Sequence, residues 1–210
     1  FYVTMHALAG TADKAVAIND RLLAMADAAR AELSDDGYPA AMYDFIKTHY
    51  EANPDKDNWE ATRDAVYDRY QLNVSDNYTY TGPVDAGINF AAGMVSLFYG
   101  QGDFLRTIRI GALAGWDSDN PTATWGGLIG FMLGRDGIEK ACADVKGYQG
   151  LSELYWITRT RRNFPDHTPN EIGEDSFPLM AERAVRIIDR VVIEEMKGGV
   201  SVEDDAWYLP

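Results

Sequence analysis

Two aspartates stand two positions apart in the stretch AGWDSDNPTATWGGLIGFMLG, residues 114–134. In an extended or turn-like loop, this spacing brings the carboxylates of Asp117 and Asp119 toward one point. Close like charges repel each other, and proteins relieve the repulsion by protonating one group or by binding a cation. Because oxygen ligands suit hard cations, the pair indicates Mg²⁺, Mn²⁺ or Ca²⁺ rather than zinc.

The same residues also have a purely structural interpretation. Pro121 fits the first turn of a helix, and Asp119 or Asn120 can cap that helix, whose dipole favours acidic groups. In this interpretation Asp119 is only a cap and Asp117 is a solvated acid, and the spacing alone does not decide between the two. A tryptophan on one side and an apolar helix on the other favour a partly buried loop, and therefore a cation.

The residues after the acidic pair narrow the type of cation site. An EF-hand is excluded, because the sixth residue counted from Asp117 is Thr122 and the twelfth is Leu128, where that motif needs glycine and glutamate. The same segment has small residues four positions apart, at Thr122, Gly126, Gly130 and Gly134. On a helix these form one stripe, which predicts that another backbone packs closely against a central helix.

Helical periodicity dominates the rest of the chain and predicts an all-α, compact multi-helix bundle. We expect residues 1–210 to belong to one such domain. The interval 71–83 is polar and predicts a loop, and another loop is expected up to about Gly173. Asp103 and Asn58 are the expected N-caps of two of the helices. We expect helices within the following ranges: 1–10, 14–33, 38–53, 58–71, 83–100, 102–115, 121–134, 135–147, 151–160 and 177–198.

Composition bounds the partners. The formal net charge of −14 argues against nucleic acid, and the basic residues Arg159, Arg161 and Arg162 are most simply a solvated segment. No apolar run approaches the roughly 20 residues of a membrane-spanning helix, so no membrane partner is expected. The single cysteine, Cys142, excludes an internal disulfide and is expected to be a small core residue.

The stretch around the acidic pair resembles a known family. AGWDSDNPTATWGGLIGFMLG is similar to the C-terminal metal-binding signature of the ADP-ribosylglycohydrolases, the group that includes the dinitrogenase-reductase-activating glycohydrolases. The usual pattern is Gly-(Gly or Trp)-Asp-Thr-Asp-(Thr or Cys) before a glycine-containing helix. The preceding GINFAAGMVSLFYGQGDFLRTIRIGALAGW and the later LSELYWITRTRR fit as well, so the likeness covers much of the chain.

The resemblance implies an all-α fold and two divalent cations, Mg²⁺ or Mn²⁺, in a cleft that binds the ribose of ADP-ribose. The implied reaction is hydrolysis of the glycosidic bond between ADP-ribose and a protein side chain or small leaving group. Asp117 and Asp119 would be metal ligands, and the amide oxygen of Asn120 would stand where the family has a hydroxyl or thiol. Asn89 and Trp116 are the candidates for substrate contact, and residues 80–85 are candidates for a place near the cleft.

The family also has an N-terminal Thr-Asp-Asp cluster and an upstream catalytic acid, which this chain does not match. The nearest match in residue type to this cluster is formed by Ser34, Asp35 and Asp36. We expect these residues to form a solvated turn in another part of the fold instead. We therefore expect the N-terminal half of the fold, with the catalytic residues, to be missing from this chain, which starts at Phe1 rather than at methionine. A separate N-terminal fragment of the same protein is the expected partner.

Two other functions stay open. The chain could be a non-catalytic, ADP-ribose-binding or structural relative, which the asparagine after the second acid favours, or a hydrolase of another N- or O-riboside. Nucleophile schemes have little support, because the three histidines, His6, His49 and His167, accompany no matching motif. The resemblance implies a cytoplasmic protein, whereas the triplets at Asn73 and Asn77 are glycosylation acceptors in a secreted one, so the compartment stays open.

Overall fold

The structure, a computed structural model, describes residues 1–151, 154–155 and 175–210. They form two compact units, residues 1–148 and residues 149–210, which are described separately. The protein is all-α, as the sequence predicts, apart from two short antiparallel strand pairs in the described part of the second unit. The first unit contains α1 (Tyr2–Thr11), α2 (Ile18–Ala31), α3 (Tyr38–Ala52), α4 (Glu60–Val66), the π-helical turn η1 (Tyr67–Leu72), α5 (Ala86–Gly100), α6 (Phe104–Leu113) and α7 (Asp119–Cys142).

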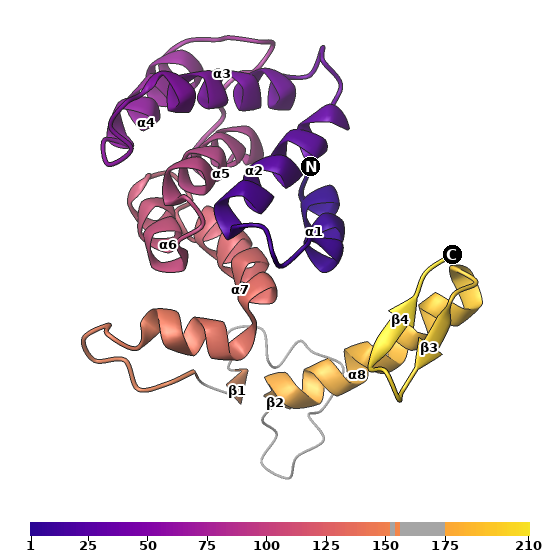
Figure 1. The fold of residues 1–210 in the computed structure, drawn as a ribbon. Helices are drawn as coiled ribbons and strands as arrows, with labels where there is room; N and C mark the ends of the chain where they lie inside the picture. The colour runs from indigo at the N-terminus through magenta and orange to yellow at the C-terminus, as the bar shows by residue number, and fades with distance from the viewer. Residues whose placement is uncertain (152–153, 156–174) are drawn as a thin grey trace. The chain divides into compact units, whose positions relative to one another are not determined.

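The centre of the first unit is α5, which packs against α3, α4, α6 and α7 (Figure 1). Its sequence AGINFAAGMVSLFYG is apolar on all sides, and such a helix is stable only when it is surrounded. Every residue from Gly87 to Gly100 is buried accordingly. Asp85 caps its start by accepting a hydrogen bond from the Gly87 amide at 2.8 Å. The helix ends at Gly100 and is followed by the C-cap residue Gln101, whose φ of 52° is left-handed.

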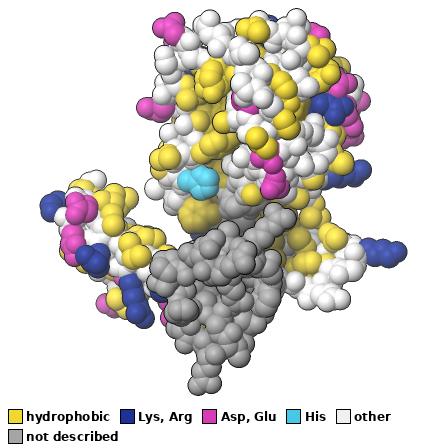
Figure 2. Space-filling view, turned by 180° about the vertical axis from the view of Figure 1, so that it is seen from behind, with side chains coloured by type: hydrophobic (Ala, Val, Ile, Leu, Met, Phe, Trp, Pro, Cys, Tyr) yellow, Lys and Arg dark blue, Asp and Glu magenta, His cyan; other side chains and the backbone are white. Residues whose placement is uncertain are grey.

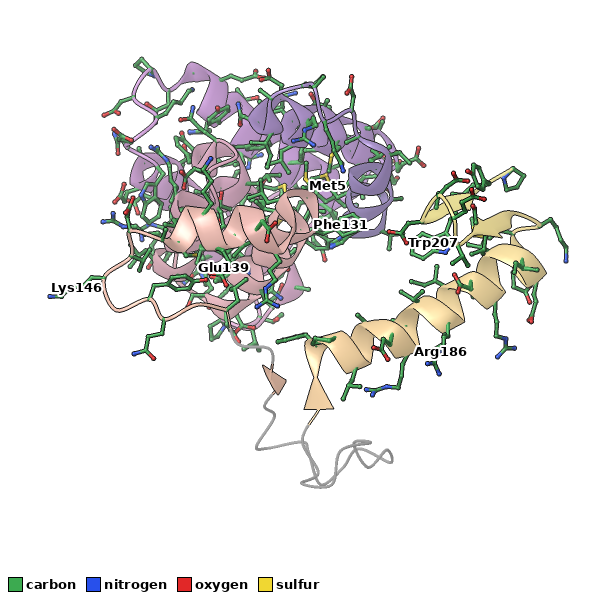
Figure 3. The ribbon with its side chains drawn as sticks, turned by 60° about the horizontal axis from the view of Figure 1, so that its bottom comes forward. Met5, Phe131, Glu139, Lys146, Arg186 and Trp207 are labelled. Carbon is green, nitrogen blue, oxygen red and sulfur yellow. The ribbon has the colours of Figure 1, made fainter. Side chains whose placement is uncertain are left out.

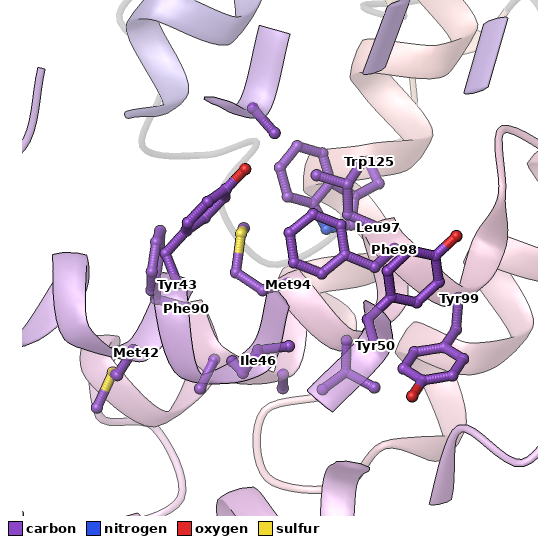
Figure 4. Packing of buried hydrophobic residues seen from close by; sticks show 14 of the residues in the cluster. Met42, Tyr43, Ile46, Tyr50, Phe90, Met94, Leu97, Phe98, Tyr99 and Trp125 are labelled. Carbon is purple, nitrogen blue, oxygen red and sulfur yellow. The ribbon is translucent and has the colours of Figure 1, made fainter. Parts of the chain in front are cut away.

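Aromatic rings fill the space between α3, α5 and α7 (Figure 4). The ring of Phe98 stacks on Tyr50 and meets the edge of Tyr43, each at 5.5 Å between centroids. Trp125 of α7 is fully buried and donates its indole N–H to the carbonyl oxygen of Gly93 at 2.7 Å. This bond satisfies the one polar atom of the side chain, so α7 is joined to the middle of α5 by both packing and hydrogen bonding.

The glycine stripe of α7 does not have the role that its spacing predicts. A Cβ atom at Gly126 would lie 3.0 Å from a side-chain atom of Ile108, but at Gly130 and Gly134 it would meet nothing within 4 Å. Gly134 has a φ of 68° and marks a kink in the helix. The prediction of close packing along the stripe is therefore wrong beyond Gly126. Instead the close approach to α7 is made by Gly111 of α6, where a Cβ atom would lie 3.1 Å from the Thr122 hydroxyl.

Two of the predicted helix starts differ from the structure. Asp103 caps α6 as expected, accepting the Arg106 amide at 2.7 Å. The N-cap of α7 is Ser118, not Asp119 or Asn120, and it makes no side-chain capping bond. Likewise α4 is preceded by Trp59 rather than by a capping Asn58. The loop expected over 71–83 lies at residues 73–85, because residues 71–72 still belong to η1, and it contains a bridge between Ser75 and Tyr78.

The second unit contains β1 (Leu154–Tyr155), β2 (Asp175–Ser176), α8 (Phe177–Arg190), the π-helical turn η3 (Val191–Glu195), β3 (Gly199–Ser201) and β4 (Ala206–Tyr208). The helix predicted over 151–160 is wrong at residues 154–155, which pair with β2; its other residues are largely outside the described part of the chain, as is the loop expected up to Gly173. The hairpin of β3 and β4 was not predicted, and its Trp207 donates a hydrogen bond to Asp189 of α8 at 2.8 Å.

Helix α8 confirms the predicted helical periodicity, but its apolar side is open. The predicted apolar face is formed by Met180, Ala184, Ile187, Ile188 and Val191. Ile187 is 62% exposed, and Val192 alone is buried among the described residues of this unit. Figure 3 shows the side chains of this unit, with Arg186 of α8 and Trp207 of β4 labelled. On the face shown in Figure 2, hydrophobic, acidic and basic side chains of the first unit are interspersed. Among the described residues, no helix is long and apolar enough to cross a membrane.

Candidate metal centre

The two acids of the candidate site lie at the junction of α6 and α7. Asp117 belongs to the turn before α7, and Asp119 is the first residue of that helix. The amide of Asn120 donates a hydrogen bond to the carbonyl oxygen of Asp117 at 2.9 Å, which closes the turn. The two acids are therefore neighbours in one tight turn, and their carboxyl groups lie close enough to interact.

That contact changes the protonation of the pair. The hydrogen bond with Asp119, partial desolvation and the neighbouring negative charge all raise the pKa of Asp117 above its usual range. The cause is physical: two carboxylates in contact repel unless a proton lies between them. A hard cation can take the place of that proton, because it also supplies positive charge to both oxygens. The donor set therefore fits part of a site for Mg²⁺ or Mn²⁺.

The acid turn is held in a strained backbone conformation. Gly115 and Trp116 have φ values of 102° and 53°, both in the left-handed region. A tryptophan in this region is uncommon, and such strain persists only where the surroundings enforce it. The Trp116 indole N–H donates to Gln71 Oε1 at 2.6 Å, and the next amide, that of Asp117, donates to Asn89 Oδ1 at 3.0 Å. These two bonds fix the turn on both sides.

Asn89 connects the acid turn to the loop before α5. Its side chain is 2% exposed, and its Nδ2 donates to the carbonyl oxygens of Pro83 and Asp85 at 2.8 and 2.9 Å. Together with the bond from Asp117, these contacts engage both polar atoms of the amide. Asn89 therefore positions the backbone of the site. The contact of Asn89 with substrate stays a prediction. The amide that would make this contact is buried and already hydrogen-bonded within the protein.

The other predicted ligands are less well placed. Asn120 is exposed, and its side chain stays a predicted ligand. Within the described ranges, no cluster of three or more His, Cys, Asp or Glu side chains with metal-binding geometry is present. Asp35 and Asp36 lie in an exposed turn, where Asp35 pairs with Arg30 at 2.9 Å, as expected for a solvated turn. The pair at Asp117 and Asp119 is thus an incomplete site in the residues described.

A pocket of about 490 Å³ adjoins the acid turn. Trp116 lines it, together with Tyr67 and Gln71 of η1 and with Tyr80 and Pro83 of the loop before α5. The sequence indicates residues 80–85 as neighbours of the cleft but does not single out Tyr67 and Gln71. These two residues were missed because they lie on a π-helical turn. Such turns are frequent at functional sites but have no simple sequence pattern.

The remaining candidates lie away from this centre or outside the described residues. Cys142 is 8% exposed and packs at the end of α7, as expected for a small core residue. His6 is exposed, and its ring bonds to the Tyr2 carbonyl oxygen at 2.9 Å. His49 packs against the ring of Phe45. His167 and the basic residues Arg159, Arg161 and Arg162 are not among the residues that the structure describes.

Comparison with known proteins identifies the family of the chain. The family model of the ADP-ribosylglycohydrolases matches residues 2–166. This is most of the chain and includes the acid turn, the pocket and all of α1 to α7. The chain belongs to the ADP-ribosylglycohydrolase family, and its fold and general class, a glycoside hydrolase family, follow from that membership. Neither a curated protein nor a solved structure matches the chain significantly.

Proposed function

We propose that the protein is a metal-dependent hydrolase of the glycosidic bond between ADP-ribose and a protein side chain or small leaving group. Membership of the ADP-ribosylglycohydrolase family supports the hydrolase class. The observation that carries the metal dependence is the placement of Asp117 and Asp119 in one strained turn at the start of α7, closed by the bond from the Asn120 amide to the Asp117 carbonyl oxygen. Mg²⁺ or Mn²⁺, in the two-ion arrangement of the family, is the proposed cofactor.

The chain's own residues have separate proposed roles. Asp117 and Asp119 hold the cation, Asn120 adds an amide oxygen, and Asn89 keeps the turn in place through the Asp117 amide. A bound divalent cation supplies positive charge that orients ribose hydroxyls and water and stabilises negative charge in hydrolysis. No described residue is assigned as the general acid or base. We propose that a catalytic acid and the remaining metal ligands are supplied by an N-terminal part of the same protein.

Replacement of a ligand tests the metal site directly. We expect Asp119→Ala to weaken Mg²⁺ and Mn²⁺ binding at least tenfold, because one of two adjacent charged ligands is lost. Calorimetric titration of the chain measures this affinity, and release of ADP-ribose from an ADP-ribosylated protein measures turnover by the complete protein. Asp136→Ala is the matched control, because Asp136 is an exposed acid of the same helix. Equal metal affinity in the two variants would refute the ligand assignment.

A second function, a non-catalytic ADP-ribose-binding or structural relative, is favoured by one observation. Asn120, which stands where the family has a hydroxyl or thiol ligand, is exposed, and the described residues supply no third acid to the pair. Binding of ADP-ribose and Mg²⁺ without release of product by the complete protein would favour this reader function, and binding of neither would favour a structural role. A hydrolase of another N- or O-riboside would turn over a riboside that lacks the second phosphate of ADP-ribose. Such turnover would distinguish it from an enzyme that acts on ADP-ribose.

A further inference from the structure

Helices α1 and α7 share an exposed surface that carries no charged side chain. From Asn120 to Gly134, α7 contains no Asp, Glu, Lys or Arg, and α1 contains none over its whole length, Tyr2–Thr11. Both helices nevertheless have one side that is open to solvent. On α7 the exposed residues recur every four positions, at Ala123, Gly127 and Phe131. The exposed side of a helix is ordinarily rich in charge, whereas the centre of an interface is depleted of it, so this pattern indicates an interface.

Phe131 joins the exposed sides of the two helices. Its side chain is 62% exposed, although it is a large aromatic residue. A Cβ atom at Gly10 of α1 would lie 4.0 Å from the Phe131 ring, so the end of α1 adjoins this side of α7 (Figure 3). Val3 and Ala7 share the side of α1 on which Gly10 lies, and Val3 is 83% exposed. We call this surface the uncharged face, and it consists of Val3, Ala7, Gly10, Ala123, Gly127 and Phe131.

The uncharged face has a projecting ring and an open space one helical turn apart. Phe131 projects from α7, whereas a Cβ atom at Gly127 would meet nothing within 4 Å among the described residues. Residues four positions apart lie on the same side of a helix, so the ring and the space are neighbours. If two such helices cross antiparallel about a two-fold axis between the two positions, each ring lies over the glycine of the other copy. The face is thus complementary in shape to itself, as an isologous interface requires.

The charge of the protein favours a second copy as the partner at this face. With a formal net charge of −14, two copies repel each other in most orientations. An isologous contact also places charged groups near the two-fold axis beside their own equivalents, which is unfavourable unless the patch is uncharged. A membrane surface fits less well, since helices that lie on membranes carry Lys and Arg beside their apolar side. Nucleic acid likewise requires basic groups, which this face lacks.

We infer that the uncharged face is a contact between two copies of this chain, with the two-fold axis between Gly127 and Phe131. Covering the exposed 62% of Phe131 in both copies removes roughly 200–300 Å² from water, whereas a stable interface buries about 1,600 Å². Val3 and Ala7 must therefore take part, and we expect a weak dimer with a dissociation constant on the order of 10 μM. The contact lies roughly 18 Å along α7 from Asp119, so it is separate from the proposed metal site and does not depend on the proposed function.

Sedimentation velocity of the full chain, from about 2 to about 200 μM, measures this association directly. We expect Phe131→Ala to weaken dimerisation at least tenfold, because the projecting ring is lost. Gly127→Phe should also weaken it at least tenfold, because the new ring fills the space that receives Phe131. Unspecific association of apolar surfaces predicts the opposite sign, since this variant adds an exposed ring. Val84→Ala shortens a 76% exposed side chain of the loop before α5, and as the matched control it should leave the dissociation constant unchanged.

A combined variant tests the shape of the contact. Gly127→Phe together with Phe131→Ala exchanges the positions of the ring and the small residue, and the two-fold pairing brings them together again. We expect this variant to recover most of the affinity that either single change loses. Far-ultraviolet circular dichroism and urea unfolding verify that each variant is folded. Both changes are compatible with a folded chain, because Phe131 is mostly exposed and the space at Gly127 is open.

Three results would overturn the inference. They are a chain that stays monomeric up to about 200 μM, stronger association of Gly127→Phe, and a combined variant that associates no better than either single one. If the chain is monomeric and the Phe131 ring is protected from hydroxyl-radical oxidation only in the complete protein, the face belongs to the N-terminal part instead. Calorimetric titration of Phe131→Ala with Mg²⁺ keeps this result apart from the proposed function, because Phe131 is not one of the proposed ligands.

Discussion

Replacement of Asn89 by alanine tests the claim that this buried amide positions the acid turn. The side chain makes three hydrogen bonds, to the Asp117 amide and to the carbonyl oxygens of Pro83 and Asp85. The Asp85 carbonyl also accepts the helical bond from the Asn89 amide at 3.2 Å, so it keeps a partner in the variant. The other two backbone groups lose theirs. At roughly 1–1.5 kcal/mol for each lost bond, the loss is about 2–3 kcal/mol.

Two smaller effects act in opposite directions on this value. Alanine is the better helix former and recovers a few tenths of a kcal/mol within α5. The buried cavity left by the shorter side chain costs a similar amount. The free energy of unfolding in urea, measured by tryptophan fluorescence, should therefore fall by about 2–3 kcal/mol. Mg²⁺ affinity should fall as well, because the turn that carries Asp117 is no longer tied to α5.

Ser96→Ala is the matched control for this experiment. Ser96 is also a fully buried polar residue of α5, but its hydroxyl makes one hydrogen bond, to the carbonyl of Thr107 in α6 at 2.8 Å, rather than to the acid turn. We expect it to cost about 1 kcal/mol and to leave Mg²⁺ affinity unchanged. The reasoning is refuted if Asn89→Ala destabilises the protein no more than Ser96→Ala, or if the two variants bind Mg²⁺ equally well.

Three further substitutions should change the free energy of unfolding: one lowers it, one raises it, and one changes its dependence on pH. Gly100→Ala would place a Cβ atom 2.0 Å from the Thr107 hydroxyl and 2.9 Å from its Cα, and we expect a loss of roughly 1–3 kcal/mol in thermal or urea unfolding. Gly130→Ala meets nothing within 4 Å and removes a flexible residue from a helix, so a gain of roughly 0.5–1 kcal/mol is expected in the same measurement. Burial opposes the charge of Asp85, but hydrogen bonds from Thr81, Tyr78 and the α5 amides outweigh it and lower its pKa below the usual 3.8. A carboxyl group whose pKa is lowered in the folded state stabilises the fold above its unfolded-state pKa, and this contribution is lost as the pH falls through the folded-state pKa. The stability advantage over Asp85→Asn should therefore be full at neutral pH and decline as the solution is acidified. An advantage that grew on acidification would contradict the assigned hydrogen bonds.

Much of the helical architecture could be predicted from the sequence, because helix formation is a local matter of periodicity and caps. The all-apolar segment that became α5 and the capping role of Asp103 are examples, and both agree with the structure. The hairpin formed by β3 and β4 was missed, although the alternation in GVSVEDDAWY and the acidic turn between its strands carried a signal. The signal was weak because each strand has only three residues.

The candidate site was only partly predictable. The spacing of Asp117 and Asp119 indicated a loop or turn that carries both acids, and they do lie in one tight turn at the start of α7. The left-handed conformation of Trp116 could not be foreseen, because tryptophan has no preference for it and the side chain bonds to a residue 45 positions away in the sequence. The glycines of α7 led to a wrong prediction of close packing for a related reason. A glycine in the sequence does not reveal whether a neighbour fills the space beside it, and at Gly130 none does.

The left-handed pair at Gly115 and Trp116 has a consequence for how a ligand is received. A loop that becomes ordered only when its ligand arrives loses conformational entropy at that moment, and the affinity is reduced by that amount. Here the turn is already restricted by the bonds that Trp116 and Asp117 donate to Gln71 and Asn89, so its disorder is lost during folding instead. The fold, rather than the ligand, bears the entropy of arranging the two acids.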